Sequence, residues 1–197
     1  MSFTLWFTGI SGAGKTTLSQ LAAQALRDRG LTVELLDGDR VRSSLGNILT
    51  FDERDRRINI RMLGLLSLLL NEHGIVSIVA AISPLEEERA RNRALLPNYV
   101  EVYCETTFAC ASRRDAKGLY KKALQGGIEN FTSISSAYEP PSATSLVLRT
   151  HQETVQESFG KLMAHLEASG HMPAPAARAD AVRPGAVQAP DADESRT

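Results

Sequence analysis

Apolar and polar residues follow one another in blocks that predict alternating strands and helices. Helical spacing is clear after residue 15, where Leu18, Leu21, Ala22, Ala25 and Leu26 recur at i, i+3, i+4, i+7 and i+8. Apolar runs predict strands at 3–7, 32–36, 75–82, 99–104 and 146–148. Further helices are expected at 52–72, 85–95 and 154–168, of which the charged 85–95 stretch is expected to be solvated. This alternation predicts an α/β fold with a mostly parallel sheet covered by helices on both faces.

The chain of 197 residues is long enough for one domain with a sizeable core. From Gly170 onward the composition changes, because four of the eight prolines fall among the last 28 residues and no apolar periodicity survives. We therefore expect a domain at 1–169 and an Ala/Pro-rich disordered tail at 170–197.

Charge and composition narrow the function classes. The formal net charge of −1 gives no support for a nucleic-acid or membrane-surface role, since both usually need a basic excess. The longest apolar stretch, 62–70, is far shorter than the ~20 residues of a membrane span. Cys104 and Cys110 form no C-x-x-C motif, and Cys104 is expected to be a small buried residue. No signal peptide is visible before the first predicted strand, so a cytoplasmic protein is expected.

The first predicted strand runs into a phosphate-binding loop. Residues 9–16 fit the pattern G-x-x-x-x-G-K-[ST] at every fixed position. In such loops, backbone N–H groups and the following helix N-terminus surround a phosphate. Lys15 would reach the β- and γ-phosphates, and the Thr16 hydroxyl would coordinate Mg²⁺. The order strand, loop, helix predicts an ATP site formed by Gly9, Ile10, Ser11, Gly12, Ala13, Gly14, Lys15, Thr16 and Thr17.

A small kinase is favoured over other users of such a loop. The N-K-x-D signature of GTPases is absent, and the chain is short for a mechanical ATPase. Kinase chemistry needs a metal and a carboxylate near the attacking hydroxyl. Asp37 and Asp39 stand at the end of the second predicted strand, where open α/β sheets gather ligands. Either could serve as the base, with Asp39 the first choice, and Asp37 could hold Mg²⁺ through water. A carboxylate turn that caps the next helix is the alternative.

Two basic clusters add to this picture. The 113–122 stretch lies beyond the fourth predicted strand, where small kinases carry a mobile lid, although a solvated face is an equal alternative. Four arginines lie within 54–61, at a helix start where cations need a compensating anion or acidic groups. Arg56 and Asn59 are three residues apart and share a helix face, which hints at an anionic acceptor.

These segments resemble the motif series of adenylylsulfate (APS) kinases, in the family's order. The motifs are Asp37-Gly38-Asp39-Arg40-Val41-Arg42, Asp55-Arg56 with Asn59-Ile60-Arg61, Ile82-Ser83-Pro84, the run from Lys117 to Ala123, and Phe131-Thr132. The resemblance covers roughly residues 3–165. It implies a P-loop three-layer sandwich with a short lid. The implied reaction transfers the γ-phosphate of ATP, with Mg²⁺, to the 3′-hydroxyl of APS, giving PAPS and ADP in sulfate assimilation. Dimers are common in the family, so a homodimer is one expected assembly.

The resemblance also implies residue roles. In such enzymes two phenylalanines sandwich the adenine of APS, and Phe51 and Phe131 fall on those positions. Ser83 falls on a serine assigned in the family as a phosphoserine position, although it could bind substrate or cap the next helix. The implied catalytic residues are Lys15, Asp37, Asp39 and Ser83, with Thr16 and Asp37 at the metal. Arg114 joins the ATP site, and the acceptor site comprises Asp39, Arg42, Phe51, Arg56, Asn59, Ile82, Ser83, Lys117, Gly118, Leu119 and Phe131.

Three stretches depart from the family pattern around the acceptor site. The usual E-N-I-R-R is I-N-I-R-M at 58–62, the phenylalanine before I-S-P is Ala81, and F-T-G-I-D is F-T-S-I-S at 131–135. A related kinase for another nucleotide-like acceptor, such as cytidine diphosphoramidate in surface-polysaccharide synthesis, is therefore the alternative. The two retained phenylalanines favour APS. A nucleotide-binding regulatory module without turnover is a third reading, which the intact loop and carboxylates disfavour.

Overall fold

The protein is built around one parallel sheet. The computed structural model describes residues 2–46, 48–50, 52–115, 118–127 and 131–172. Five strands lie in the order β2-β3-β1-β4-β5, and each neighbouring pair is parallel. Their bounds are β1 Thr4–Thr8, β2 Val33–Asp37, β3 Val76–Ala80, β4 Tyr99–Glu105 and β5 Leu146–Arg149. The predicted parallel sheet is confirmed. The fully buried β1 and β3 occupy its centre, as expected of near-continuous apolar runs.

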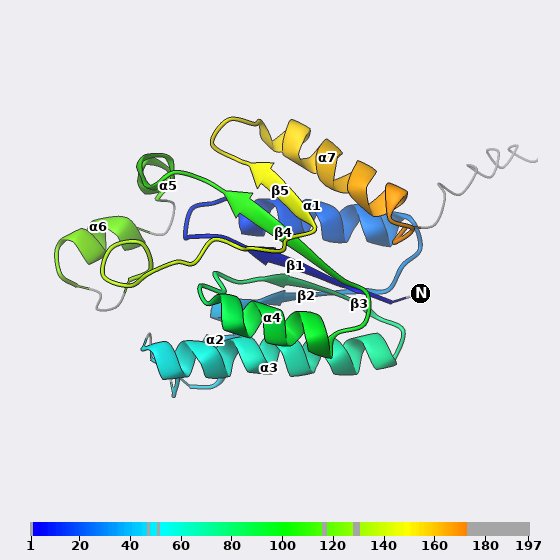
Figure 1. Cartoon of the computed structure of the whole chain (residues 1–197), viewed down its shortest axis with the longest axis horizontal. Helices are drawn as coiled ribbons and strands as arrows, with labels where there is room; N and C mark the ends of the chain where they lie inside the picture. Colours follow the sequence, from blue (N-terminus) through cyan, green and yellow to red (C-terminus); the bar gives the residue numbers. More distant parts are fainter. Residues whose placement is uncertain (1, 47, 51, 116–117, 128–130, 173–197) are drawn as a thin grey trace, which may run out of the picture.

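Helices cover both faces of the sheet, which confirms the three-layer expectation (Figure 1). On one face lie α1 (Lys15–Asp28) and α7 (Val155–Ala168). On the other lie α2 (Gly38–Ser44), α3 (Glu53–Glu72) and α4 (Glu86–Leu95). Two short helices, α5 (Phe108–Arg114) and α6 (Leu119–Leu124), stand beyond the carboxyl ends of the strands (Figure 1).

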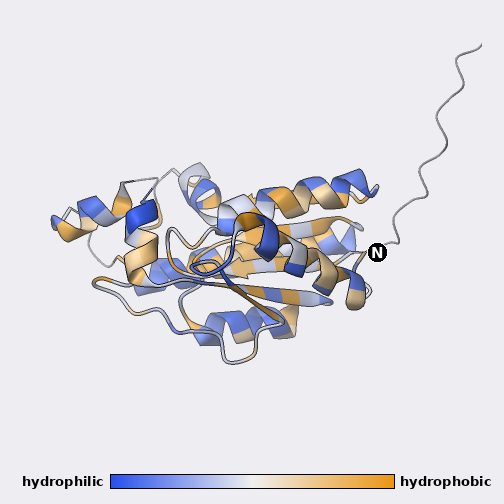
Figure 2. Cartoon of the chain, turned by 90° about the horizontal axis from the view of Figure 1, so that it is seen from above, coloured by the Kyte–Doolittle hydropathy of each residue, from blue (hydrophilic) through white to orange (hydrophobic). Residues whose placement is uncertain are grey.

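The core has one part on each side of the sheet. Leu5 and Phe7 of β1 pack into the larger cluster with α1 and α7, whereas Trp6 packs into the smaller one with Ile60 and Leu63 of α3. This division follows from the alternation of side chains along a strand. Figure 2 shows the apolar strands between helices that are polar on their outer sides. The carboxyl ends of the strands remain outside this packing and carry the loops that hold chemistry.

The expectation that 85–95 forms a solvated helix is wrong in part. The helix is present as α4, but it buries Glu88, Arg89 and Asn92, each 2% exposed or less. Glu88 and Arg89 are buried because they have charged or carbonyl partners outside α4, whereas the buried amide of Asn92 has no hydrogen-bond partner among the described residues. Glu88, for example, accepts hydrogen bonds from Arg57 and Arg61 of α3.

The C-terminal end of the described chain stays packed beyond α7. Met172 is 8% exposed and belongs to the larger core cluster, and the His171 ring meets the Phe3 ring edge-on at 5.0 Å. The division into a 1–169 domain and a 170–197 tail stays a prediction, since residues 173–197 lie outside the described part. In that described part, the helices are too short or too polar to cross a membrane.

Candidate active site

The P-loop joins β1 to α1 at the carboxyl edge of the sheet. Its glycines permit close backbone contact. A β-carbon on Gly9 would lie 2.5 Å from the Cys104 carbonyl oxygen, and one on Gly12 would lie 2.8 Å from that of Ala111. Gly9 and Gly12 also have φ values of 139° and 73°, which L side chains rarely adopt. The loop therefore requires glycine at these positions for both space and conformation.

Lys15 lies against the loop that it is predicted to serve. Its ammonium donates to the carbonyl oxygens of Gly9 and Ile10, both at 2.8 Å, and the residue is 9% exposed. Gly14 caps α1 without a side-chain hydrogen bond, and the first turn of α1 contains no acidic residue. Thr16 and Thr17 are exposed at this same turn. The combination of a positive helix end, exposed hydroxyls and a nearby ammonium suits an anion.

The base of the predicted lid is hydrogen-bonded to the P-loop. Tyr120 of α6 donates its hydroxyl to the Ser11 carbonyl at 2.9 Å. Arg114 of α5 donates to the carbonyl oxygens of Gly12 at 3.5 Å and Thr150 at 2.5 Å. Arg114 thus lies beside the loop, as its predicted ATP-site role requires. Tyr120 was missed as a site residue, although it belongs to the 117–123 motif run.

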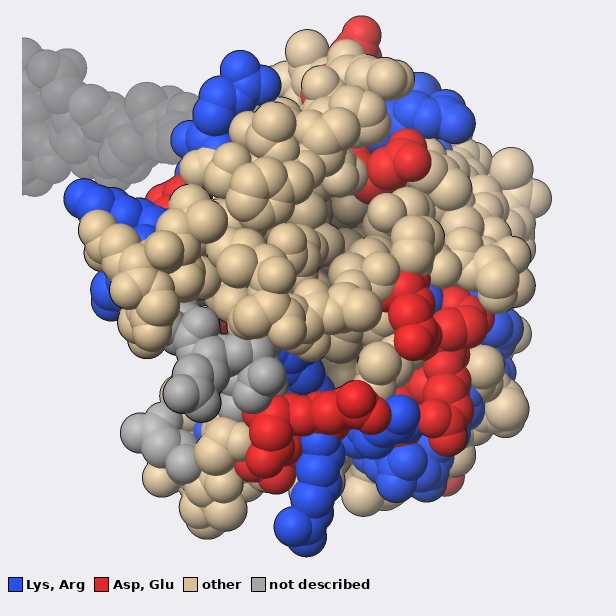
Figure 3. Space-filling model, turned by 60° about the vertical axis from the view of Figure 1, so that its left-hand side comes forward, with Lys and Arg blue, Asp and Glu red and all other residues tan. Residues whose placement is uncertain are grey.

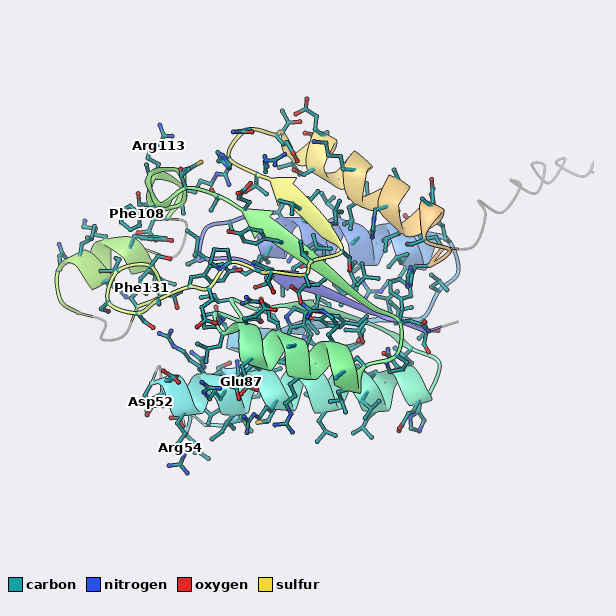
Figure 4. The ribbon with its side chains drawn as sticks, in the orientation of Figure 1. Asp52, Arg54, Glu87, Phe108, Arg113 and Phe131 are labelled. Carbon is teal, nitrogen blue, oxygen red and sulfur yellow. The ribbon has the colours of Figure 1, made fainter. Side chains whose placement is uncertain are left out.

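An aromatic group surrounds Tyr120. Its ring meets those of Phe108 and Phe131 edge-on, with centroids 5.5 Å and 5.0 Å apart. Figure 4 shows Phe108 and Phe131 together beside α5 and α6, while Arg113 points outward. Phe131 is 8% exposed. The predicted adenine-stacking residue is therefore joined to the lid and, through Tyr120, to the P-loop.

Asp37 acts as the N-cap of α2. Its Oδ1 accepts hydrogen bonds from the backbone N–H groups of Asp39 at 2.9 Å and Arg40 at 3.0 Å. This confirms the capping alternative for Asp37. Asp39 stands exposed in the first turn of the same helix. Of the two carboxylates, Asp39 is the better placed to meet a ligand.

Arg56 links α3 to the segment 131–136. Its Nη1 donates to Thr132 Oγ1 at 3.0 Å and Ser136 Oγ at 2.9 Å, and the residue is 7% exposed. Burial, followed by the nearby charge of Arg42, lowers the pKa of Arg56. Burial also lowers the pKa of Arg42, against the opposing charges of Asp39 and Asp55. Two partly desolvated guanidinium groups close to each other favour an anionic ligand.

Asn59 shares the face of Arg56, as predicted. It is 3% exposed, and its Nδ2 donates to the Gly38 carbonyl at 3.4 Å. Arg57 and Arg61 instead pair with Glu88, and Arg57 also with Glu53 and Glu87. Acidic groups thus compensate these two cations. In Figure 3, acidic and basic side chains alternate over the lower part of the molecule, and in Figure 4 Arg54 points outward from the start of α3.

Serines occupy the family's glycine and aspartate positions at 133 and 135. Ser133 has a φ of 76°, a left-handed conformation that glycine adopts more easily. Ser135 Oγ accepts a hydrogen bond from the Phe131 N–H at 2.8 Å. The turn therefore forms without the glycine and the carboxylate, and it still orients Phe131 and Thr132 toward α3 and α6.

Ser83 is buried at the end of β3 rather than presented to solvent. It is 1% exposed, and its Oγ accepts a hydrogen bond from Trp6 Nε1 at 2.9 Å. Its φ of 49° is unusual for a residue with a side chain. The preceding Ile82 carbonyl accepts from the Gly9 N–H at 3.3 Å and from Thr8 Oγ1 at 2.7 Å. The Ile82–Ser83 backbone is therefore attached directly to the start of the P-loop.

A cavity of about 550 Å³ opens beside this loop. Ile10, Tyr103, Thr106, Phe108 and residues 133–138 line it. Its walls contain none of the predicted acceptor residues, so it adjoins the predicted acceptor site without coinciding with it. Gly118 caps α6 with a φ of 64°, and Leu119 packs against the larger core. Phe51 and Lys117 lie outside the described residues.

Among the described residues, the P-loop offers an exposed oxygen ligand for a metal. No group of three or more His, Cys, Asp or Glu side chains in that part of the chain is arranged to hold a metal. The exposed Thr16 hydroxyl beside a phosphate-binding loop suits Mg²⁺, which keeps several waters and is usually bound through one or two protein oxygens and substrate phosphates. The donor set thus fits the predicted ion.

Comparison with known proteins identifies the family. The sequence profile of adenylylsulphate kinase covers residues 1–149. The chain belongs to the adenylylsulphate kinase family. It is 43% identical over 174 residues to an adenylyl-sulfate kinase of Rippkaea orientalis, covering 88% of this chain and 96% of that protein. It is 46% identical over 171 residues to a protein of Sorangium cellulosum named "Probable bifunctional SAT/APS kinase 2", covering 87% of this chain and 29% of that longer protein.

A solved structure supports the same assignment. The APS kinase of Mycobacterium tuberculosis, in complex with AMPPNP and APS, superposes with a TM-score of 0.79 at 37% identity, covering 84% of this chain and 98% of that one. The P-loop kinase fold is thereby confirmed. The chain is an enzyme of the adenylyl-sulfate kinase type that uses ATP with Mg²⁺.

Proposed function

We propose that this chain transfers the γ-phosphate of ATP to the 3′-hydroxyl of APS, giving PAPS and ADP for sulfate assimilation in the cytoplasm. One observation supports the assignment of these residues to the ATP and APS sites. The P-loop and the face formed by Arg42, Arg56 and Asn59 lie at the same carboxyl edge of the sheet. The Ile82–Ser83 turn is hydrogen-bonded to Gly9 of the P-loop, and Asn59 is hydrogen-bonded to Gly38, which packs closely against Ala81 just before that turn. Donor and acceptor are therefore held by elements that touch each other.

On the donor side, residues Gly9 to Thr17 would hold the phosphates of ATP. Backbone N–H groups of the loop and the N-terminus of α1 would bind phosphate oxygens. Lys15 would leave its carbonyl partners for the β- and γ-phosphates, and its charge would stabilise the transferring group. Arg114 would lie on the nucleotide side of the loop. Thr16, with Asp37 through water, would hold Mg²⁺, which neutralises the developing phosphate charge when bound.

On the acceptor side, Arg42, Arg56 and Asn59 would bind the phosphosulfate and ribose, with Lys117, Gly118 and Leu119 contributing from the lid. Phe51 and Phe131 would stack on the adenine, a contact worth about 1–3 kcal/mol per base in single-strand binders. Asp39 would accept the proton of the attacking hydroxyl. Since Asp37 Oδ1 already caps α2, Asp39 remains the first choice. Ser83 would support this site through its backbone, because its Oγ is bonded to Trp6.

ADP release with Mg-ATP tests the proposal, with APS and cytidine diphosphoramidate offered in parallel. We expect turnover with APS, and a loss of about 10²-fold or more in Lys15→Ala, because Lys15 acts on the charge of the transition state. Lys161→Ala is the matched control, since the half-exposed Lys161 pairs with Glu153, away from the P-loop. Turnover with the cytidine compound alone would overturn the APS assignment. No turnover with either acceptor would favour a regulatory module.

The assembly is a separate part of the proposal. A homodimer follows from the resemblance alone, and light scattering during size-exclusion chromatography tests it. A monomeric mass across the working concentration range would contradict it without affecting the kinase assignment.

A further inference from the structure

Arg89 is a fully buried arginine whose position nothing in the sequence motifs explains. It lies on the inner face of α4 and is 0% exposed. A guanidinium is almost never buried without partners. Two carboxylates lie beside it. Glu86 Oε2 accepts from Nη2 at 2.6 Å, Glu101 Oε1 lies 3.9 Å from Nε, and Arg93 shares both carboxylates. Its charge is therefore compensated locally, which leaves the question of what its remaining donors hold.

Those donors reach two backbone segments far apart in sequence. Nη1 donates to the Ser83 carbonyl at 2.5 Å, and Nη2 donates to the Glu139 carbonyl at 2.6 Å. The guanidinium carbon also lies 5.7 Å from the centre of the Tyr138 ring. The planar fork of one arginine thus contacts the turn after β3 and the segment after Ser136 at the same time.

Further hydrogen bonds join the same two segments. The Glu139 N–H donates to the Pro84 carbonyl at 2.9 Å, and the Glu86 N–H donates to Glu139 Oε2 at 2.6 Å. The Tyr138 hydroxyl bonds to Thr8 Oγ1 at 2.9 Å, at the last residue of β1 before the P-loop. The two segments are therefore joined to each other and to the P-loop around a single buried cation.

Both segments lead directly into the proposed acceptor site. The first contains Ile82 and Ser83, and the φ of 49° at Ser83 must be maintained by its surroundings. The second directly follows Phe131, Thr132 and Ser136, of which the last two bind Arg56. A shift of either segment would move one side of the acceptor site relative to the other.

We propose that Arg89 is a positioning residue of the acceptor site, which fixes the Ser83–Pro84 turn and the Tyr138–Glu139 segment relative to each other without touching substrate. The inference rests on the proposed function and extends it to a residue outside the family motifs quoted above. It assigns Arg89 to the alignment of the acceptor, because its guanidinium donates directly to these two segments and reaches the P-loop only through them.

The test is Arg89→Lys, assayed by ADP release with APS and ATP varied in turn. Lysine keeps the charge for Glu86 and Glu101, but its donors radiate from one nitrogen and cannot span two carbonyl groups as a planar fork does. We expect the KM for APS to rise about tenfold and the KM for ATP to stay within about twofold, since a misplaced binding group costs productive alignment of one substrate only. Equal effects on both substrates, or none on either, would overturn the proposal.

Arg93→Lys is the matched control. Arg93 binds the same two carboxylates but contacts neither backbone segment. We expect unchanged KM values in this variant, and an APS effect equal to that of Arg89→Lys would assign the change to the charge network. If Arg89→Lys does not fold, Tyr138→Phe is the second variant, because it removes the hydrogen bond between the Tyr138–Glu139 segment and Thr8. This variant must then raise the KM for APS, and an unchanged KM would overturn the proposal. Wild-type protein without APS turnover would instead contradict the proposed function itself.

Discussion

Ser133 has a backbone conformation that its own β-carbon opposes. Its φ of 76° is held by a hydrogen bond from its N–H to the Ser136 carbonyl at 2.8 Å and by the bond between Ser135 and Phe131. A left-handed residue with a side chain costs about 1–2 kcal/mol. The turn that presents Phe131 is therefore stable because its neighbours compensate one strained residue.

Replacing Ser133 with glycine should stabilise the protein. Relief of strain exceeds the extra chain entropy of glycine, and we expect the free energy of unfolding to rise by about 0.5–1 kcal/mol. Thermal unfolding measures this as a Tm increase of about 1–4 °C for a domain of this size. Ser112→Gly, inside α5, should lower the Tm instead. A lower Tm in Ser133→Gly would show that the serine side chain contributes more than its strain costs.

The Trp6–Ser83 hydrogen bond predicts a coupled effect on stability. Ser83→Ala leaves the fully buried Trp6 Nε1 without its acceptor, at a cost of about 1–3 kcal/mol. Because Trp6→Phe removes the same bond from the other side, the double variant should lose less than the sum of the two single losses. Urea unfolding of the three variants measures the coupling.

Turnover of the same Ser83→Ala variant separates two roles for this serine. We expect kcat to fall far less than the about 10²-fold typical of removing a group that acts on the transition state. Ser83 is 1% exposed, and its Oγ already accepts a hydrogen bond from Trp6, which suits a structural role. A loss as large as that of Lys15→Ala would support the phosphoserine reading.

At the scale of elements, α3 and α4 are joined by a carboxylate between two arginines. Glu88, 2% exposed, accepts from Arg57 at 3.1 Å and Arg61 at 2.6 Å. Burial alone would raise the pKa of Glu88, but the hydrogen bonds from Arg61 and Arg57 outweigh it, and the pKa lies below its usual 4.5. The pairing therefore favours the charged form in the folded protein.

This pairing predicts a pH-dependent effect of Glu88→Gln. Because the pKa of Glu88 is lower in the folded protein than in the unfolded chain, its ionised carboxylate stabilises the fold. This stabilisation is complete above the pKa of the unfolded chain and is lost as the pH falls through the pKa of the folded protein. The variant should lose about 1–3 kcal/mol at pH 7, and the difference from wild type should shrink below about pH 4. Urea unfolding at the two pH values measures it. Glu87→Gln should change little, since Glu87 is 72% exposed. A loss independent of pH would contradict the role of the charge.

Sequence patterns predicted the elements that depend on local periodicity. All five strands, α1, α3 and α7 follow from apolar spacing, and the P-loop follows from its fixed residues. The short helices α5 and α6 were missed because six or seven residues give too few turns for a period, and α2 was considered only as the helix that Asp37 would cap in the alternative interpretation. The burial of Arg89 could not be read from its neighbours in sequence, because its carbonyl partners lie 6 and 50 residues away.

At the scale of the whole molecule, the packed chain continues past the last helix. The Met172 side chain, 8% exposed, joins the larger core, and its sulfur accepts a hydrogen bond from Arg29 at 3.5 Å. His171 lies edge-on to Phe3, the residue just before the first strand. The two ends of the described chain are thus held together by residues that composition alone assigns to the tail.

Truncation locates the end of the domain. A chain ending at Met172 should unfold like the full chain and keep its ADP release, because the core contacts of His171 and Met172 are retained. A chain ending at Ser169 should lose about 1–3 kcal/mol, the value of one large apolar side chain returned to water, with turnover little changed since the site lies at the opposite edge of the sheet. Urea unfolding and ADP release measured on both chains decide between a domain of 169 residues and one of 172. If the chains ending at Ser169 and Met172 are equally stable, the domain ends at residue 169. If the chain ending at Met172 is less stable than the full chain, residues after 172 also support the fold.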